Sequence, residues 1–304
     1  MKKISTFFLV AVLLGTAMAQ APLACYSFDG NYNDALNGRH LSNTTTTLVP
    51  GPWGGVDSVC QFNATLSSIV RLPKTAALRP ALLSMSVWVK PESTEPQYII
   101  FQKNRQAANH EGFVLAFIDT AFKFIKLSPD SGKYSNCQSG KVELNNWSHV
   151  GMVFTGDSIR LYVNAVRVAA DKSAFPIEYD TTSMILGGSG VSFNLPFHGA
   201  LNNLKIYDRV LTPAEISTDY FQHPGCVTAG IARQNAVSNA INMFPNPARD
   251  FLHLSAPSHV DIYSVNGKKL YSQNQIQTVP VHHLPRGLCF VRINSGKARS
   301  LILE

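Results

Sequence analysis

Hydrophobic and polar residues alternate with a period of two along much of the chain. Residues 83–90, 150–154 and 159–163 each place apolar side chains at every second position, which is the pattern of a β-strand with two different faces. Turn-forming sequences separate such segments, at residues 50–52, 130–132, 155–157 and 187–188. Many short strands at this spacing predict an all-β fold, a sandwich or a barrel, rather than βαβ units.

One segment has the signature of a helix. Thr212 offers an N-cap, Pro213 suits the first helical position, and Glu215 can reach back to the N–H of the cap. These residues form a capping box. The helix is expected to run to about Phe221, because Pro224 cannot continue the hydrogen-bond ladder.

The N-terminus, residues 1–19, is expected to be a secretory signal peptide. A short basic start precedes an apolar stretch over residues 4–14, and small residues then favour cleavage before Gln20. The apolar stretch is too short for a membrane span, which needs about 20 residues. A lipoprotein signal that ends at Cys25 is the alternative, but Pro22 stands where an aliphatic residue is wanted.

Two domains are predicted to follow, joined by a linker. The chain has 304 residues, and a single domain usually has ~100–200. Residues 21–226 carry a first series of strands, residues 227–240 lack a strand pattern, and residues 241–304 carry about six further short strands. Asn266-Gly267 is a hairpin signal, because both residues accept a positive φ. The second domain is therefore predicted to be a small Ig-like β-sandwich.

The formal charge of +7 does not indicate a nucleic-acid partner. Between residues 21 and 225 the basic and acidic residues balance, at 16 each, and the excess lies near the ends and in the linker. No cluster of Lys and Arg marks a helix or a stripe, as a nucleic-acid surface would require. Neither a nucleic-acid partner nor a transmembrane segment is expected.

Five cysteines fit an exported chain, in which disulfides are permitted. They are Cys25, Cys60, Cys137, Cys226 and Cys289. The four in the first domain allow three pairings, among which the sequence does not choose. No pair has the C-x-x-C spacing of a zinc or redox site, so one or two disulfides and a buried thiol are expected.

Six short motifs occur in order in the first domain. They are CYSFDGN at 25–31, CQFN at 60–63, SVWVKP at 86–91, WSHV at 147–150, LYVN at 161–164, and GALNNLKIY at 199–207 followed by the capped helix. Over about residues 23–221 they resemble the laminin-G-like, concanavalin A-like jelly-roll modules of bacterial secreted proteins. The resemblance implies two packed antiparallel sheets with a shared core, in which Trp88 and Trp147 are packing anchors.

A second set of motifs lies in residues 241–304. It comprises FPNPA at 244–248, DIYSVNGK at 261–268, LPRGL at 284–288 and FVRI at 290–293. These resemble the type A sorting domain of the type IX secretion system of Bacteroidota. The residues that match its motif are Pro245, Asn246, Pro247, Gly267, Lys268, Leu284 and Gly287. The resemblance implies export across the outer membrane, then removal of this domain and either attachment to surface lipopolysaccharide or release. Cys289 stands where the family carries tyrosine, and we interpret it as a packing residue.

The sequence offers no recognisable catalytic set, so an enzyme is not expected. Glycoside hydrolysis uses two carboxylates, and residues 178–180 come nearest to the E-x-D-x-x-E pattern of such jelly rolls but lack the third acid. Neither G-x-S-x-G nor H-E-x-x-H occurs. His110, His149, His198 and His223 have no acidic or cysteine neighbours at ligand spacing, and are interpreted as surface or capping residues.

Calcium is the one metal that the resemblance suggests. Related modules hold it near the rim of the sandwich, and the ion takes 6–8 oxygen ligands. The candidate ligands are Asp29, Asn31, Asp34 and Asn202. Amides stand where the family carries three acids, which lowers the charge available to the ion.

These observations lead to a hypothesis of function. The jelly roll and the surface address favour a secreted, cell-surface recognition module that binds a carbohydrate or glycoprotein. Sugar sites on such folds lie in rim loops, where Tyr32, Trp53 and Asn109 are the candidates. The alternative is a structural or adhesive surface protein with a protein partner, and a polysaccharide-active enzyme is third. The type IX secretion machinery is the partner expected during export.

Overall fold

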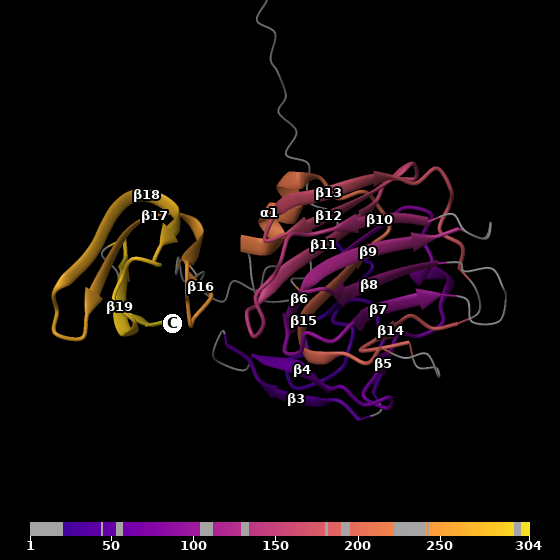
Figure 1. Ribbon diagram of the computed structural model, residues 1–304, viewed down its shortest axis with the longest axis horizontal. Coiled ribbons are helices and arrows are strands. Elements are labelled where there is room, and N and C mark those ends of the chain that lie inside the picture. Colours follow the sequence, from indigo (N-terminus) through magenta and orange to yellow (C-terminus); the bar gives the residue numbers. More distant parts are fainter. Residues whose placement is uncertain are drawn as a thin grey trace, which may run out of the picture.

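The computed structural model describes residues 21–43, 45–52, 57–103, 112–128, 134–179, 182–189, 195–221, 226, 241, 243–294 and 299–304. Within these residues the strands form three antiparallel sheets, accompanied by one α-helix and one short 3-10 helix, η1 (Ala76–Leu78) (Figure 1). The all-β prediction is confirmed. The predicted signal peptide and the predicted linker, residues 227–240, lie outside the described residues.

The first sheet has eight strands. Its order is β13 (Val166–Lys172), β12 (Ser158–Val163), β11 (Ser148–Phe154), β6 (Leu83–Pro91), β15 (His198–Tyr207), β4 (Ser58–Asn63) and β3 (Thr47–Pro50), with β1 (Ala24–Tyr26) also paired to β15. Chain segments more than a hundred residues apart are neighbours in it, because β6 lies between β11 and β15.

The second sheet has seven strands and packs against the first. Its order is β10 (Tyr134–Gln138), β9 (Ala121–Leu127), β8 (Gly112–Ile118), β7 (Gln97–Lys103), β14 (Ile185–Leu186), β5 (Val70–Arg71) and β2 (Ser42–Asn43). Alternate residues of both sheets form one buried core, in which Val87 of β6 and Phe113 of β8 are fully inaccessible. The period-two pattern of the sequence arises from this shared core.

The helix α1 (Pro213–Phe221) covers the outer face of the eight-stranded sheet. The predicted capping box is present, since the N–H of Thr212 donates to Glu215 Oε2 at 2.8 Å and the N–H of Glu215 donates to Thr212 Oγ1 at 3.2 Å. Gly151 lets the helix approach, because a Cβ there would lie 3.2 Å from Cδ1 of Ile216. No described helix is long and apolar enough to cross a membrane.

The C-terminal domain is a five-stranded sheet with its own core. Its strands are β16 (Met243–Phe244), β17 (Phe251–Ser264), β18 (Lys269–Pro280), β19 (Gly287–Ile293) and β20 (Arg299–Leu303). Four of the short strands predicted from the sequence are joined into the two long strands β17 and β18. Register shifts along this pair, between His253 and Ser258 among others, let each strand bend without ending. The hydrogen bonds therefore connect one continuous sheet.

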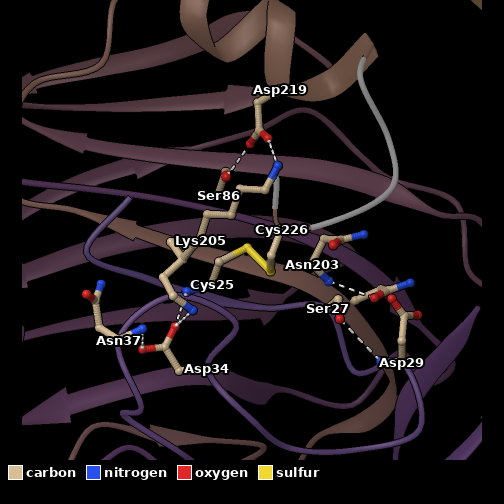
Figure 2. The surroundings of a disulfide bond; sticks show 12 residues. Cys25, Ser27, Asp29, Asp34, Asn37, Ser86, Asn203, Lys205, Asp219 and Cys226 are labelled. Carbon is tan, nitrogen blue, oxygen red and sulfur yellow. Dashed lines mark hydrogen bonds and ion pairs between the residues drawn. A yellow bond between two sulfur atoms is a disulfide. The ribbon is translucent and has the colours of Figure 1, made fainter. Parts of the chain in front are cut away.

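A disulfide joins the two ends of the large domain. Cys25 in β1 is bonded to Cys226, which follows α1, with an S–S distance of 2.05 Å (Figure 2). The sequence left three pairings open for the four cysteines. Cys25 pairs with Cys226, and the other two, Cys60 and Cys137, remain free buried thiols. Cys289 is also free and buried, as expected of a packing residue.

Candidate functional site

Asp34, a predicted calcium ligand, has a structural role. Its carboxylate is 5% exposed and accepts hydrogen bonds from four backbone N–H groups, those of Cys25, Leu36, Asn37 and Arg39. These bonds fix the loop after β1 and use the lone pairs that a metal would need. Asp34, which the sequence suggested as a metal ligand, therefore stabilises the loop after β1.

The other predicted calcium ligands also bond within the protein. Asp29 accepts from the N–H of Ser58 at 3.3 Å, and Asn31 accepts from the N–H of Asn33 at 2.8 Å. The buried amide of Asn202 donates to Asp57 Oδ1 at 3.0 Å. Figure 2 shows Asp29 and Asp34 on opposite sides of the disulfide. The described residues contain no group of three or more His, Cys, Asp and Glu side chains placed to hold a metal, and calcium binding stays a prediction.

Of the three predicted sugar ligands, Tyr32 lies among the described residues. Tyr32 packs edge-on against Phe28, with ring centroids 6.2 Å apart, and its hydroxyl bonds to Thr46. The half-buried ring therefore packs within its loop, and its role in sugar binding stays a prediction. Trp53 and Asn109 lie outside the described residues.

The predicted sorting-motif residues organise the C-terminal sheet. Asn246, which lies between Pro245 and Pro247, accepts from the N–H of Ile302 at 2.8 Å and so ties the domain's first segment to its last strand. Gly267, at φ 78°, and Lys268 form the turn between β17 and β18, and Leu284 is buried in the domain core. Gly287, at φ 108°, begins β19. The motif residues therefore form turns of the sheet, connect its first segment to its last strand, and fill its core.

A buried polar cluster fixes α1 to the sheet. Asp219 of the helix accepts from the hydroxyl of Ser86 and pairs with Lys205 (Figure 2). It also lies 3.1 Å from Nε2 of His149. His149 is 1% exposed, so its interpretation as a surface residue was wrong. No local pattern predicts this contact, because Asp219 lies 70 residues further along the chain.

The two domains touch through an aromatic cluster on the same face. Trp88 stacks on Tyr220, with centroids 5.5 Å apart, and meets Phe244 of the C-terminal domain edge-on at 6.1 Å. His253 of β17 lies 5.2 Å from the Tyr220 ring, and Arg249 pairs with a glutamate of the large domain. In Figure 1 the C-terminal domain accordingly lies on the side of the sandwich that carries α1.

We expect this domain contact to weaken on acidification. Burial lowers the pKa of His253 to about 4, so the ring is neutral when the domains are in contact. A released His253 titrates near 6.5; the contact is therefore fully favourable above pH 6.5 and weakens as the pH falls toward 4. The Arg249–Glu143 ion pair also joins the two domains. Small-angle scattering against pH measures domain separation. His253→Phe, which does not titrate, should keep the compact form to lower pH, and equal profiles for both proteins would contradict this role of His253.

No described helix or sheet covers the opposite side of the sandwich, yet Phe101, Val114 and Ile185 on it are buried, at 7%, 4% and 3% exposure. There, one row of residues crosses the outer face of the seven-stranded sheet in register, with Arg71 opposite Ile185, Ile185 opposite Phe101, and Phe101 opposite Val114. Phe101 and Val114 pack together with Tyr98 in an apolar cluster separate from the main core. This face thus combines a cation at one edge with an apolar centre.

A cavity of about 300 Å³ opens on this face beside Phe101. Phe101 and Ile185 supply apolar surface, Thr182 and Ser183 supply hydroxyls, and Arg71 and Lys74 are cationic; these residues lie on several different segments. The volume is at the lower end of the range of small-molecule sites. A second, larger hollow, about 500 Å³, lies between the two domains and includes Trp88, Trp147 and His253 in its wall.

Comparison with known families identifies both parts of the chain. Residues 63–217 match the concanavalin A-like lectin/glucanases superfamily, in its laminin G form. The chain belongs to this superfamily. Residues 242–303 match the secretion system C-terminal sorting domain, which directs a protein through type IX secretion to the cell surface or the extracellular space. The match to the sorting domain thus confirms the predicted export to the cell surface or the extracellular space.

Solved structures share the fold of this lectin/glucanase-like chain. Domain 4 of AbnA, a GH43 extracellular arabinanase from Geobacillus stearothermophilus solved with arabinotriose, is 20% identical over 65% of this chain and 97% of its own, with a TM-score of 0.51. The botulinum neurotoxin serotype D ligand binding domain, solved with N-acetylneuraminic acid, is 12% identical over 92% of this chain and 72% of its own, with a TM-score of 0.53. At these identities the likeness shows the fold alone. No curated protein matches the chain.

Sequence reasoning missed the cavity of the lectin/glucanase-like domain. Arg71, Phe101 and Ser183 belong to three segments that only the strand pairing brings together. The strand that carries Arg71 has two residues, too few for a period-two signal.

Proposed function

We propose that the exported protein is a surface recognition module that binds a carbohydrate or glycoprotein in the cavity on the outer face of its seven-stranded sheet. The observation that carries the proposal is the difference between the two outer faces. The face of the eight-stranded sheet is occupied by α1 and by the sorting domain, whereas the other face holds a cavity with apolar and hydroxyl surface. Protein sites for small ligands combine these two kinds of surface.

The proposal is for binding without turnover. Hydrolysis of a glycosidic bond uses two carboxylates on either side of it, and no Asp or Glu is among the described residues that line the cavity. Two proteins of the same fold were solved with bound sugars, arabinotriose and N-acetylneuraminic acid. Those ligands belong to those proteins, and they support only the class of ligand proposed here.

A thermal melt of the exported chain against a panel of polysaccharides and oligosaccharides tests this function. A ligand at about 100 times its Kd adds about 2.7 kcal/mol to the apparent stability of the native state, so one sugar class should raise the Tm saturably. Ser183→Trp places an indole at the cavity mouth and should abolish the shift. Thr218→Trp, on the exposed side of α1, is the matched control and should retain it.

The outcomes separate the candidate functions. A sugar-induced shift that persists in Ser183→Trp would place the site elsewhere on the protein. No shift with any sugar, with or without calcium, would overturn carbohydrate binding and favour the adhesive alternative. That alternative has one structural support, the exposed valines Val166 and Val168 on the edge strand β13, where a protein partner could add a strand.

A further inference from the structure

We infer that the cavity on the seven-stranded sheet selects an acidic saccharide, one whose sugar unit carries a carboxylate. The inference rests on the proposed function and adds the ligand class. Arg71 and Lys74 both line the cavity, and none of the ion pairs among the described residues involves either of them. Two cations in a cavity wall that holds no described acid create a local preference for an anion.

The charge is local rather than general. Acidic and basic residues balance over residues 21–225, at 16 each, so the large domain has no overall positive field to attract polyanions. In this wall Arg71 is half-buried and Lys74 is exposed. A half-buried guanidinium keeps more of its interaction energy than one in open solvent. We therefore expect Arg71 to bind the charged group of the ligand.

The spacing along the sheet matches a sugar ring with a carboxylate at one end. Arg71 and Phe101 both lie opposite Ile185 in register, on either side of it. Neighbouring strands are about 4.8 Å apart, so the two backbone positions are about 10 Å apart. An acid group held at Arg71 would leave the rest of its sugar unit beside the small accessible parts of Ile185 and Phe101 that line the cavity. Charge and apolar surface thus lie in the order that a uronic or sialic unit presents them.

The cation side of the cavity is held firmly to the sheet. The N–H of Leu72 donates to the carbonyl of Met184 at 2.9 Å, which joins the residue after Arg71 to the residue after Ser183. Backbone hydrogen bonds from Thr75 and Leu78 then shape the turn that carries Lys74. Binding groups on a fixed backbone lose less conformational entropy when the ligand arrives.

A guanidinium can hold a carboxylate by paired hydrogen bonds, because its planar fork donates to both oxygens at once. This predicts a difference between Arg71 and its lysine variant. Lysine keeps the charge and loses the paired geometry, so Arg71→Lys should bind a carboxylated sugar more weakly than the natural protein and more tightly than Arg71→Gln. Attraction by charge alone would make Arg71→Lys equal to the natural protein.

Equilibrium titration of the full exported chain tests the inference. The probes are oligogalacturonate and sialyllactose, their carboxylate-free counterparts (methyl-esterified oligogalacturonate and lactose), and dextran sulfate. We expect a carboxylated probe to bind and its counterpart to bind at least about tenfold more weakly. Arg71→Gln should raise its Kd about tenfold to a hundredfold, the range for losing a charged hydrogen bond. Arg167→Gln, exposed on the opposite sheet, is the control and should change nothing.

Failure of the inference and failure of the proposed function give different results. Equal binding of acid and neutral probes, or unchanged binding in Arg71→Gln, would overturn the acidic ligand while Ser183→Trp still tests the cavity. Dextran sulfate bound as tightly as the carboxylated probes, with Arg71→Lys equal to the natural protein, would overturn carboxylate selection. No binding of any saccharide would overturn both proposals.

Discussion

Asp219→Ala is expected to lower the free energy of unfolding by about 3–5 kcal/mol, the cost of breaking a buried ion pair from one side. The carboxylate lies beneath α1, paired with Lys205 and accepting from Ser86. Without it the Lys205 ammonium, on a side chain 13% exposed, has lost its ion pair beneath the helix. Urea-induced unfolding measures the loss, and the fluorescence of Trp88, which stacks on the next helical residue, reports whether α1 has left the sheet.

Two further variants separate this cluster from a general effect of losing an acid. Asp208 is exposed just after β15, and Asp208→Ala should change stability by no more than about 0.5 kcal/mol. The double variant Asp219→Ala with Lys205→Ala should cost less than the sum of the single variants, since each charge is harmful mainly when the other is missing. An additive double variant would show that the two charges do not act as a pair.

The same cluster gives the large domain an acid-sensitive element. Burial alone would raise the pKa of Asp219, but Lys205 and His149 hold that pKa well below its usual range. A carboxyl whose pKa is lower in the folded state binds a proton more readily when unfolded, so stability falls with pH. Its contribution is complete above about pH 4, the usual carboxyl pKa, and is lost progressively below it. Asp219→Asn should flatten this part of the pH–stability curve.

The sequence predicted the sandwich because its strands follow a simple period. β6 was expected over residues 83–90 and occupies Leu83–Pro91, and the capping box at Thr212 was found with the hydrogen bonds expected of it. These features depend on residues within one turn or one strand. Local chemistry decides them, so a local pattern is sufficient.

The faces of the strands were harder to predict. In β6 the residues between the core positions, among them Ser86 and Trp88, have the pattern of a solvent face, yet both are buried. The resemblance implied a packing role for Trp88, whereas nothing implied the burial of Ser86. The helix covers Ser86, and the helix with the sorting domain covers Trp88. The alternation of residues along a strand shows on which face of the sheet each side chain lies. Whether that face is exposed to solvent depends on what packs against it in the fold. Small serines between large apolar residues are the sequence feature compatible with a covering helix.

The predicted site residues show the same limit. An acid in a turn-rich loop can bind a metal or cap backbone N–H groups, and Asp34 has the second role. The cavity residues Arg71 and Ser183 are 112 positions apart and meet through the short strands β5 and β14. No local pattern encodes such a meeting. Export to the cell surface or the extracellular space was predictable because the sorting domain is recognised from short contiguous motifs.

Loss of the Cys25–Cys226 disulfide is expected to lower the stability of the large domain by about 2–5 kcal/mol, as for other native disulfides in exported domains. The bond joins residues 201 positions apart, and in the chain-entropy account a longer closed loop restricts the unfolded chain more. Cys25→Ser with Cys226→Ser, or reduction of the natural protein, should lower the Tm. Reducing the double variant should change nothing further, which controls for effects on other groups.

The disulfide should also affect the end of α1 and, through it, the contact between the two domains. Cys25 lies in β1 against β15, and Cys226 follows α1, so the bond anchors the end of the helix beside the sheet that its other residues cover. Releasing it frees the last turn of α1, where Tyr220 contacts both Trp88 and His253. We therefore expect reduction to separate the sorting domain from the large domain before either unfolds, seen as an increased radius of gyration at temperatures below the Tm. Cys60→Ser, which alters a buried free thiol of the same core, should lower the Tm without that expansion. A reduced protein that stays compact up to its Tm would show that the aromatic contact holds α1 without the covalent bond.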